Sequence, residues 1–479
     1  MKVLFANPPA YLYDENKRYI QGGSRWSHSY KLNRLKTEEM IKKKIYPYTP
    51  YPFFLGYAAS NSLDVGKVDF LDGVALNYNE QIFIDKIKKM SPDLVVLETP
   101  TVSFPLVMKL IREIKSETGT KIAIAGIHAT AKAIQEMYSN KFIDFAFTNE
   151  FEESSKELIM RELNPKGVKG VIYREENNVQ NNGPRPYKRD IDELNYPFRD
   201  PSVIDRYEDF TLIGHPNVQM MSSRGCPVGC NFCYTTVFYQ NPIYRPRSAI
   251  KVVQEMDYIQ ERYHAKQIYF DDDTISINPN HISSISNTII QERSSIPWTC
   301  MGDITVSEEN VRLMAKANCI GMKFGVESSD PEVLLKMHKG IVSSNKVLKF
   351  RDILKKYNIW AHATFSIGHP GDTEDTIRAN IEFVKMLKPD SIQISMATPV
   401  PGTKFFEEAE ANDWLVSPNW IDFDGNSEAS LSYPHLPKES IDRLFEEFWD
   451  YWNNRKLGFR GTLNLISKRK HRIVERILK

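Results

Sequence analysis

Short apolar runs alternate with longer amphipathic segments over residues 1–150, and this alternation constrains the fold more than any other feature. The runs are KVLFANPP, KVDFLDG, DLVVLETP, KIAIAGIH and FIDFAFTNE, and each is apolar at consecutive positions rather than at every second one. Strands covered on both faces have this pattern, and helical stretches such as NEQIFIDKIKKM separate them. The alternation predicts an α/β fold, with a doubly wound, Rossmann-like parallel sheet in residues 1–165.

A second series of strand-like runs follows residues 166–213, a segment whose sequence pattern differs from the alternation before it. That segment combines a hairpin pattern, GVIYREENNVQNNGPRP, with a proline-spaced connector. The later runs are NVQMMSS, QIYFDDD, WTCMGD, CIGMKFGVES, WAHATFSIGHPG and SIQISMATPVPG, again separated by helical patterns. They predict a partial (β/α)6 barrel of the TIM type in residues 214–403, because eight units close the standard barrel. Residues 404–479 are expected to form a mostly helical C-terminal region.

The bulk composition limits the class of protein and its partners. The chain has 479 residues, of which 41% are hydrophobic and 26% charged, and its formal net charge is +1. This near balance provides no overall field for nucleic acid, so nucleic acid is not expected as a partner. An odd, small number of cysteines indicates a reducing compartment. We expect neither a signal peptide nor a membrane-spanning run, which predicts a cytoplasmic protein.

Three cysteines lie close together after the first expected barrel strand, in the stretch SSRGCPVGCNFCYTTVF. The thiolates of Cys226, Cys230 and Cys233 could converge on one iron or zinc centre. A structural zinc ion needs a fourth ligand, and Cys300 and Cys319 are not spaced to provide it; core packing is the simpler interpretation of both. A 4Fe-4S cluster held by three thiolates instead leaves one iron with an open coordination site.

This cysteine spacing, with Phe232 before the last thiol, resembles the radical S-adenosylmethionine (radical SAM) superfamily. The runs YFDDDT, FGVES, FSIGHPGDTEDT and PVPGT are similar to motifs in its successive barrel strands. The resemblance implies that the cysteines ligate a 4Fe-4S cluster whose open iron binds S-adenosylmethionine. Reductive cleavage would release methionine and a 5'-deoxyadenosyl radical that removes a substrate hydrogen. It also implies a one-electron donor such as flavodoxin or ferredoxin.

The same resemblance implies further contacts to S-adenosylmethionine. Phe232 would lie near the adenine, and Asp272, Asp273 and Glu327 would be the acidic contacts of its amino group and ribose. The simpler alternative is that the aspartates form a solvated strand end and that Glu327 makes a surface ion pair.

The first domain resembles the cobalamin-binding class of radical SAM enzymes. The motifs that carry this likeness include NPPAYLY, GGSRWSH, FLDG, VVLETPTVS and GIHATA, while the glycine-rich dinucleotide fingerprint is absent from the first turn. The likeness implies a bound cobalamin, with candidate contacts at Thr99, Thr101, Gly126 and His128. The D-x-H-x-x-G signature is absent, so the lower axial ligand of cobalt is unassigned. His128 could equally be an ordinary hydrogen-bonding histidine.

Glu150 is a further candidate contact, in a turn where relatives often have Gly-Glu and this chain has Asn149 and Glu150. Because asparagine tolerates left-handed backbone, the turn itself is expected to survive.

The resemblance implies methylation of an unactivated carbon through methylcobalamin. The segments HATFSIGHPGDTEDTI and LSYPHL most resemble the sequences of hopanoid-biosynthesis-associated members of the family, some of which contract a ring. Rearrangement, ring contraction or cyclisation of a lipid-linked or sugar-linked substrate without methyl transfer is therefore the alternative. A cobalamin or cluster sensor without turnover is a further alternative.

The tail RKLGFRGTLNLISKRKHRIVERILK, from Arg455, is basic and contains one acidic residue, Glu475. As an amphipathic helix it could lie on an anionic membrane surface, which would suit a lipid substrate. A solvated end helix docked on the barrel is the alternative.

Overall fold

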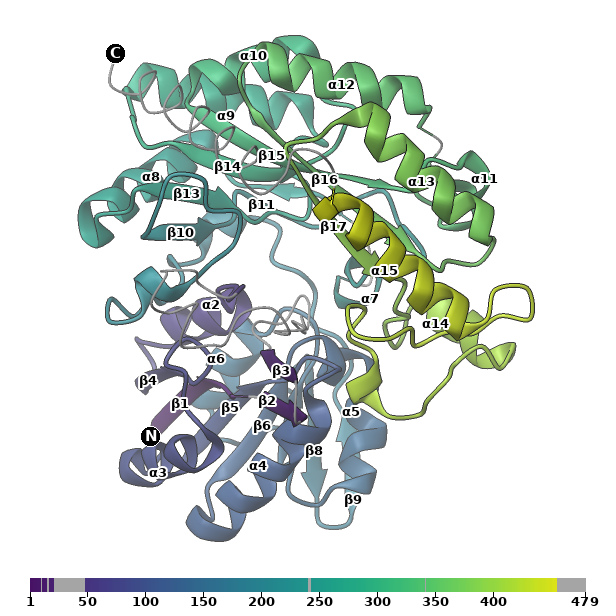
Figure 1. Cartoon of the computed structure of the whole chain (residues 1–479). Helices are drawn as coiled ribbons and strands as arrows, with labels where there is room; N and C mark the ends of the chain where they lie inside the picture. Colours follow the sequence, from purple (N-terminus) through teal and green to yellow (C-terminus); the bar gives the residue numbers. More distant parts are fainter. Residues whose placement is uncertain (10, 15–16, 21–47, 240–242, 341, 455–479) are drawn as a thin grey trace.

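The computed structural model describes residues 1–9, 11–14, 17–20, 48–239, 243–340 and 342–454, with no side chains described for 11–20 (Figure 1). The GGSRWSH motif and the basic tail from Arg455 therefore lie outside the described residues. Figure 1 shows two α/β units, a purple-to-blue N-terminal one and a teal-to-green one, with the yellow C-terminal region beside the second. No described helix is long and apolar enough to cross a membrane.

The first unit contains a seven-stranded sheet. Its order is β4 (Lys67–Asp72), β1 (Lys2–Asn7), β5 (Leu94–Glu98), β6 (Lys121–Ala125), β7 (Phe145–Phe147), β8 (Val171–Glu175) and β9 (Asn178–Asn181). The strands from β4 to β7 pair in parallel, in the 2-1-3-4-5 order of a doubly wound fold, and confirm the predicted class. The β8–β9 hairpin adds two antiparallel strands to the same sheet, so the first half of the expected connector belongs to this unit.

Both faces of the parallel part of this sheet are apolar, because consecutive side chains of each strand point to opposite sides. In β1, for example, Val3 and Phe5 join one buried cluster while Leu4 and Ala6 join the other. The helices supply the rest of both clusters: α2 (Phe53–Asn61) and α6 (Glu152–Met160) on one side, and α3 (Glu80–Met90), α4 (Phe104–Thr118) and α5 (Ile127–Ser139) mainly on the other. This sheet leaves only its edges for binding.

The second unit is a parallel six-stranded sheet that curls into a partial barrel. Its order is β10 (Asn217–Met220), β13 (Gln267–Phe270), β14 (Trp298–Gly302), β15 (Cys319–Glu327), β16 (Trp360–Ile367) and β17 (Ser391–Met396). Each strand is followed by helical structure, principally α8 (Ala249–Tyr263), α9 (Pro279–Glu292), α10 (Glu308–Lys316), α12 (Ser344–Lys356) and α13 (Glu374–Leu387). The expected partial barrel is confirmed.

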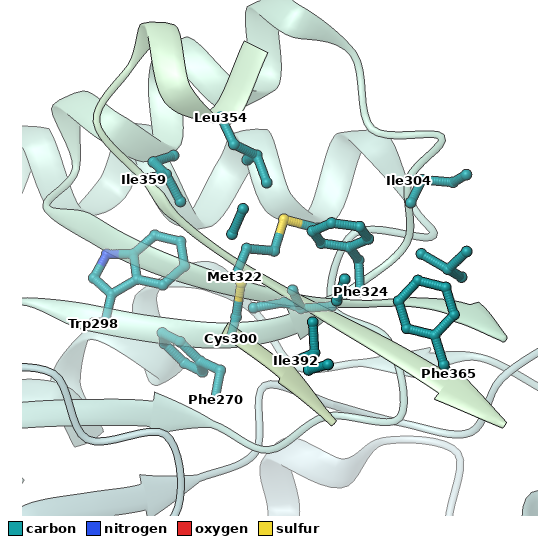
Figure 2. Close-up of a cluster of buried hydrophobic side chains, with 14 of the residues drawn as sticks. Phe270, Trp298, Cys300, Ile304, Met322, Phe324, Leu354, Ile359, Phe365 and Ile392 are labelled. Atoms are coloured by element: carbon teal, nitrogen blue, oxygen red, sulfur yellow. The ribbon is translucent and has the colours of Figure 1, made fainter. Parts of the chain in front are cut away.

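Side chains of the barrel strands alternate between two different environments. Figure 2 shows the outer one, where Phe270, Trp298, Met322 and Phe324 pack with residues of the surrounding helices. Cys300 belongs to this core and Cys319 is equally buried in it. The other face points into the barrel lumen and is lined largely by polar side chains, which matters for the site.

The C-terminal region covers one side of the barrel. It contains α14 (Lys404–Ala411), a 3-10 turn η3 (Trp420–Asp422) and α15 (Lys438–Asn454). Figure 1 shows the yellow α15 alongside β17 and α13. Leu444, Phe445 and Phe448 of α15 are buried in the barrel core. The region therefore protects the open edge of the sheet at β17.

Candidate functional site

One cavity of about 350 Å³ opens at the carboxyl ends of the barrel strands. Its lining includes the cysteine loop, the inward faces of the barrel strands, the edge of the first unit, a loop of the C-terminal region, and Asp209 of the connector between the units. The first unit contributes Pro100, Thr101, Val102 and Ile127, and the C-terminal loop contributes Phe423 to Asn426. Parallel α/β units bind ligands at this end of their strands.

The cysteine loop follows the short strand β11 (Ser223–Arg224) and ends where helix α7 (Thr235–Phe238) begins. Cys226, Cys230 and Cys233 all line the cavity and are partly buried. Gly225 has a φ of +84°, and a β-carbon there would lie 2.3 Å from the carbonyl oxygen of Ile243. Only glycine therefore fits at the entry to the loop.

The three thiols fit a cluster better than a single ion. In the part of the chain that the structure describes, no group of three or more His, Cys, Asp or Glu side chains is arranged to hold one metal ion. A 4Fe-4S cluster makes a different demand, because each thiolate binds a separate iron. Burial raises the pKa of the Cys226 and Cys230 thiols to about 12, so the thiolates require a bound metal centre to form at neutral pH.

Asp272 and Asp273 hold the start of the cysteine loop. Asp272 is buried and accepts hydrogen bonds from the backbone of Ser222 at 2.8 Å and from its hydroxyl at 2.6 Å, as well as from Ser223. Asp273 accepts from the backbone N–H of Gly225 at 2.8 Å and from the Tyr234 hydroxyl. Both aspartates also line the cavity, so the structure places them at the site and gives them a bracing role that the sequence did not indicate.

Glu327 lies at the end of β15, where the pairing with β16 is irregular and its own φ is +59°. Its carboxylate accepts a hydrogen bond of 2.5 Å from Lys339, and both side chains line the cavity. Burial disfavours the Lys339 ammonium, but the Glu327 carboxylate outweighs it and raises the pKa of Lys339. Sequence analysis missed Lys339, which lies after a helix and carries no strand-end signal.

Phe232 packs against a second aromatic group of the site, His369. Their rings meet edge to face at 5.0 Å, and His369 in turn stacks on Phe405 at 5.6 Å. The Nε2 atom of His369 lies 2.8 Å from the Ser366 hydroxyl, and burial lowers the pKa of the imidazole to about 3. Phe232 therefore sits in the cavity beside a neutral histidine, a surface suited to a flat ring.

The candidate cobalamin contacts do not all reach the cavity. Thr101 lines it, whereas the Thr99 hydroxyl donates to the carbonyl of Ala125 at 2.8 Å within the first sheet. Gly126 has a φ of +97° and is the N-cap residue of α5, and a β-carbon there would approach the side chain of Glu98 at 3.3 Å. Neither Thr99 nor Gly126 is a lining residue, but both shape the turn that carries Ile127 into the cavity.

His128 is enclosed rather than presented to the cavity. Its ring stacks on Phe104 at 4.1 Å and meets Trp420 of the C-terminal region edge to face at 5.4 Å. Nδ1 lies 3.4 Å from the Thr101 hydroxyl, and Nε2 lies 3.5 Å from Glu136. Burial lowers the pKa of His128. The structure thus shows His128 as a packed, neutral side chain.

Glu150 belongs to an ionic group that joins the two units. Its carboxylate accepts from Arg224 at 2.7 Å and from both terminal nitrogens of Arg245 at 2.8 Å. Burial opposes the charge, but the two guanidinium groups outweigh it and lower the pKa of Glu150. The preceding Asn149 has a φ of +61°, which is the left-handed conformation expected of this turn. Glu150 therefore binds Arg224, which is two residues before Cys226, and is not among the residues that line the cavity.

A cavity capped by three cysteines, above a partial parallel barrel and against a doubly wound unit, is the arrangement of a radical SAM enzyme with an added N-terminal domain. Residues 220–384 match the radical SAM superfamily. The chain belongs to this superfamily, whose members hold a 4Fe-4S cluster and use S-adenosylmethionine, as the cysteine spacing predicted.

Similar proteins agree with this assignment. An uncharacterised methyltransferase of Pyrococcus horikoshii is 31% identical over 86% of this chain and 89% of its own length. The hopanoid C-3 methylase of Methylococcus capsulatus is 26% identical over 67% of this chain and 62% of its own. The structure of the radical SAM methyltransferase TsrM of Kitasatospora setae, with cobalamin and a [4Fe-4S] cluster bound, superposes with a TM-score of 0.61 at 17% identity, over 76% of this chain and 73% of that one.

Proposed function

We propose that this protein is a cobalamin-dependent radical SAM enzyme that transfers a methyl group to an unactivated carbon. One observation carries the proposal: the edge of the doubly wound unit and the cysteine loop line the same cavity. A cofactor held by the first unit would then lie within reach of a substrate activated at the second. The methyltransferase names of the relatives, and the cobalamin in TsrM, support the same conclusion.

The residues at this edge fit a corrin ring. Pro100, Val102 and Ile127 offer an apolar surface, and Thr101 adds a hydroxyl. His128, enclosed between Phe104 and Trp420, is not available as an axial ligand, in keeping with the absent D-x-H-x-x-G signature. When bound, cobalamin would supply the methyl carrier, and the cluster with S-adenosylmethionine would supply the hydrogen-abstracting radical.

The chain's own residues would hold these groups and keep water out. Cys226, Cys230 and Cys233 would bind the cluster, with Asp272 and Asp273 fixing their loop. Phe232 and the Glu327–Lys339 pair would contact S-adenosylmethionine. Val102, Val400 and Phe423 provide apolar surface where the first unit meets the C-terminal region, which limits water at the reacting carbon.

Anaerobic reconstitution with iron, sulfide and cobalamin tests the proposal. With reductant and S-adenosylmethionine, methyl transfer should yield S-adenosylhomocysteine as well as 5'-deoxyadenosine in the presence of substrate. Formation of 5'-deoxyadenosine alone would favour rearrangement or cyclisation, and formation of neither would favour a sensor.

We also propose a small-molecule or lipid-linked substrate and a one-electron donor of the flavodoxin or ferredoxin type, because reductive cleavage requires one electron per radical.

We further propose a peripheral membrane contact through the basic tail. The test is liposome co-sedimentation of the chain with and without the residues after Tyr451. Equal sedimentation would contradict a membrane contact.

A further inference from the structure

The lumen of the barrel, below the cysteine loop, is lined by polar side chains. Tyr269 of β13, Lys323 of β15, Thr364 of β16 and Gln393 of β17 all face the same cavity as the cysteines. Their strand neighbours Phe270, Phe324, Phe365 and Ile394 are buried in the outer core. Thr364 and Gln393 are direct partners across β16 and β17, so their side chains lie side by side. We call this part of the cavity the lumen well.

The connector between the two units closes the floor of the lumen well. Asp209 forms an ion pair with Lys323, and the ring of Phe210 lies 5.3 Å from that of His362. Gln267 donates to the Phe210 carbonyl at 2.9 Å and fixes the segment beneath the strands. In the described part of the chain, the well is therefore closed at this floor and continuous with the space beside the cysteine loop.

Polar groups on the β17 wall of the well are open to a ligand. The side chains of Gln393 and Ser395 are partly exposed to the cavity, and neither makes a hydrogen bond within the part of the chain that the structure describes. They point to the same side of β17, because they are two residues apart. The Thr364 hydroxyl lies 3.5 Å from the Phe324 carbonyl, at the limit of a hydrogen bond. An amide and hydroxyls left open in an enclosed well are expected to find a partner.

The charge of the cavity lining opposes an anionic partner. The lining contains Lys323 and Lys339 as its ammonium groups. Its carboxylates are Asp209, Asp271, Asp272, Asp273, Asp303, Glu327 and Asp424. Seven negative and two positive formal charges give −5 for the described lining. The carboxylate of S-adenosylmethionine would be bound by the open iron of the cluster, but a phosphate or carboxylate of a substrate in the lumen well would have no such partner. It would meet unfavourable electrostatics, and both lysines of the described lining are already paired.

We infer that the lumen well binds an uncharged substrate that carries hydroxyl, carbonyl or amide groups, through Gln393, Ser395 and Thr364. The inference rests on the proposed function, because it assigns the substrate class of that same site. Lys323 and Asp209 form an ion pair that shapes the floor. The Gln393 amide can both donate to and accept from the substrate.

The experiment uses the reconstituted holoenzyme and an extract of the source organism, with lipids kept in detergent micelles. Ion exchange divides the extract into uncharged, anionic and cationic fractions. Each fraction is incubated with S-adenosylmethionine labelled in its methyl group with deuterium, and stimulation of 5'-deoxyadenosine formation over the background is measured. We expect stimulation by the uncharged fraction. Stimulation confined to either charged fraction would overturn the inference.

Substitutions in the lumen well test whether the stimulation depends on binding there. The double variant Q393A/S395A should lower the ratio of stimulated to unstimulated 5'-deoxyadenosine formation about tenfold, since it removes the hydrogen bonds that hold the substrate. Gln254→Ala, on the exposed side of α8, is the matched control and should behave like the parent. A double variant stimulated as strongly as the parent would also overturn the inference.

The label separates this inference from the proposed function. Transfer of deuterated methyl to a compound of the anionic fraction would support methyl transfer and contradict the uncharged substrate. Stimulation by the uncharged fraction without label transfer would support the uncharged substrate and contradict methylation.

Discussion

The two parallel sheets of this protein are built from the same strand and helix repeat, but they bury their side chains differently. In the first sheet both faces are apolar, as Val3 and Leu4 show by joining clusters on opposite sides. In the barrel, one face is apolar and the other is polar, as Phe324 and its neighbour Lys323 show. A flat sheet with helices on both faces can bind a ligand only at its edge. A curled sheet also encloses an interior space in which a ligand can bind.

The difference assigns separate tasks to the two units. The first presents a small, mostly apolar edge to the cavity, which suits a preformed cofactor with a flat face. The barrel supplies the ionisable and hydrogen-bonding groups, and with them selectivity. If this division is correct, substitutions in one unit should leave the task of the other intact.

The largest effect is expected from Cys230→Ala. Loss of one thiolate should abolish 5'-deoxyadenosine formation, because the cluster would no longer be held with an open iron, while bound cobalamin is retained. Chromatography of the nucleoside and the visible absorption of cobalamin measure the two tasks separately. Loss of cobalamin together with the nucleoside would contradict the separation of the two sites.

A pair of substitutions on opposite faces of the barrel sheet tests the burial contrast. Phe324→Ala should lower the free energy of unfolding by about 3–5 kcal/mol, because it leaves a cavity in the outer core. Gln393→Ala should change it by about 0.5 kcal/mol or less, because that side chain is partly exposed in the lumen well rather than buried in the outer core. Urea unfolding of both variants is the measurement. Equal losses would mean that the lumen is also a packed core.

Glu150→Gln tests the joint between the two sheets. Removing this carboxylate leaves Arg224 with Glu152 alone and Arg245 without its ion-pair partner, at an expected loss of about 3 kcal/mol. Unfolding should then separate into two transitions by calorimetry. Glu153→Gln, whose partly exposed carboxylate lies 3.6 Å from Lys188, is the control and should keep a single transition.

The last prediction concerns the pH dependence of stability, through one buried carboxyl in each unit. Burial raises the pKa of Asp72, at the end of β4, and of Asp372, after β16, to about 6. Because the folded pKa is above the unfolded value of 3.8, the stabilisation from proton binding is fully present below about pH 4 and is lost as the pH rises through 6.

Unfolding free energies from pH 4 to 7 check this prediction. Asp72→Asn and Asp372→Asn should each flatten the decline by a similar amount. A variant that steepens the decline would show that folding lowers, rather than raises, the pKa of the substituted carboxyl.

The sequence predicted what depends on local pattern. Consecutive apolar runs located the strands of the first sheet, and the cysteine spacing located the loop and its superfamily. The turn at Asn149 was also predicted, because left-handed backbone is a property of the residue itself. The polar positions of SIQISM, at every second residue, carried the signal for the lumen well, but a single strand does not show which face is concave.

What the sequence could not predict depends on contacts between distant residues. The enclosure of His128 requires Trp420, which is far along the chain, and the partner of Glu327 is a lysine without any motif. The position of Glu150 against Arg224 and Arg245 likewise follows from how the units dock. Candidate residues were therefore found, while their partners were not.

The connector also has a consequence for any attempt to divide this protein. Its Tyr207 donates to Asp72 of the first unit at 2.9 Å, its Arg199 pairs with Glu255 of α8 at 3.0 Å, and its Asp209 pairs with Lys323 inside the barrel. A barrel expressed from residue 214 onward would keep all three cysteines yet expose an unneutralised lysine and lose the base of its own chamber. An attempt to graft the barrel onto another domain would therefore have to include the connector.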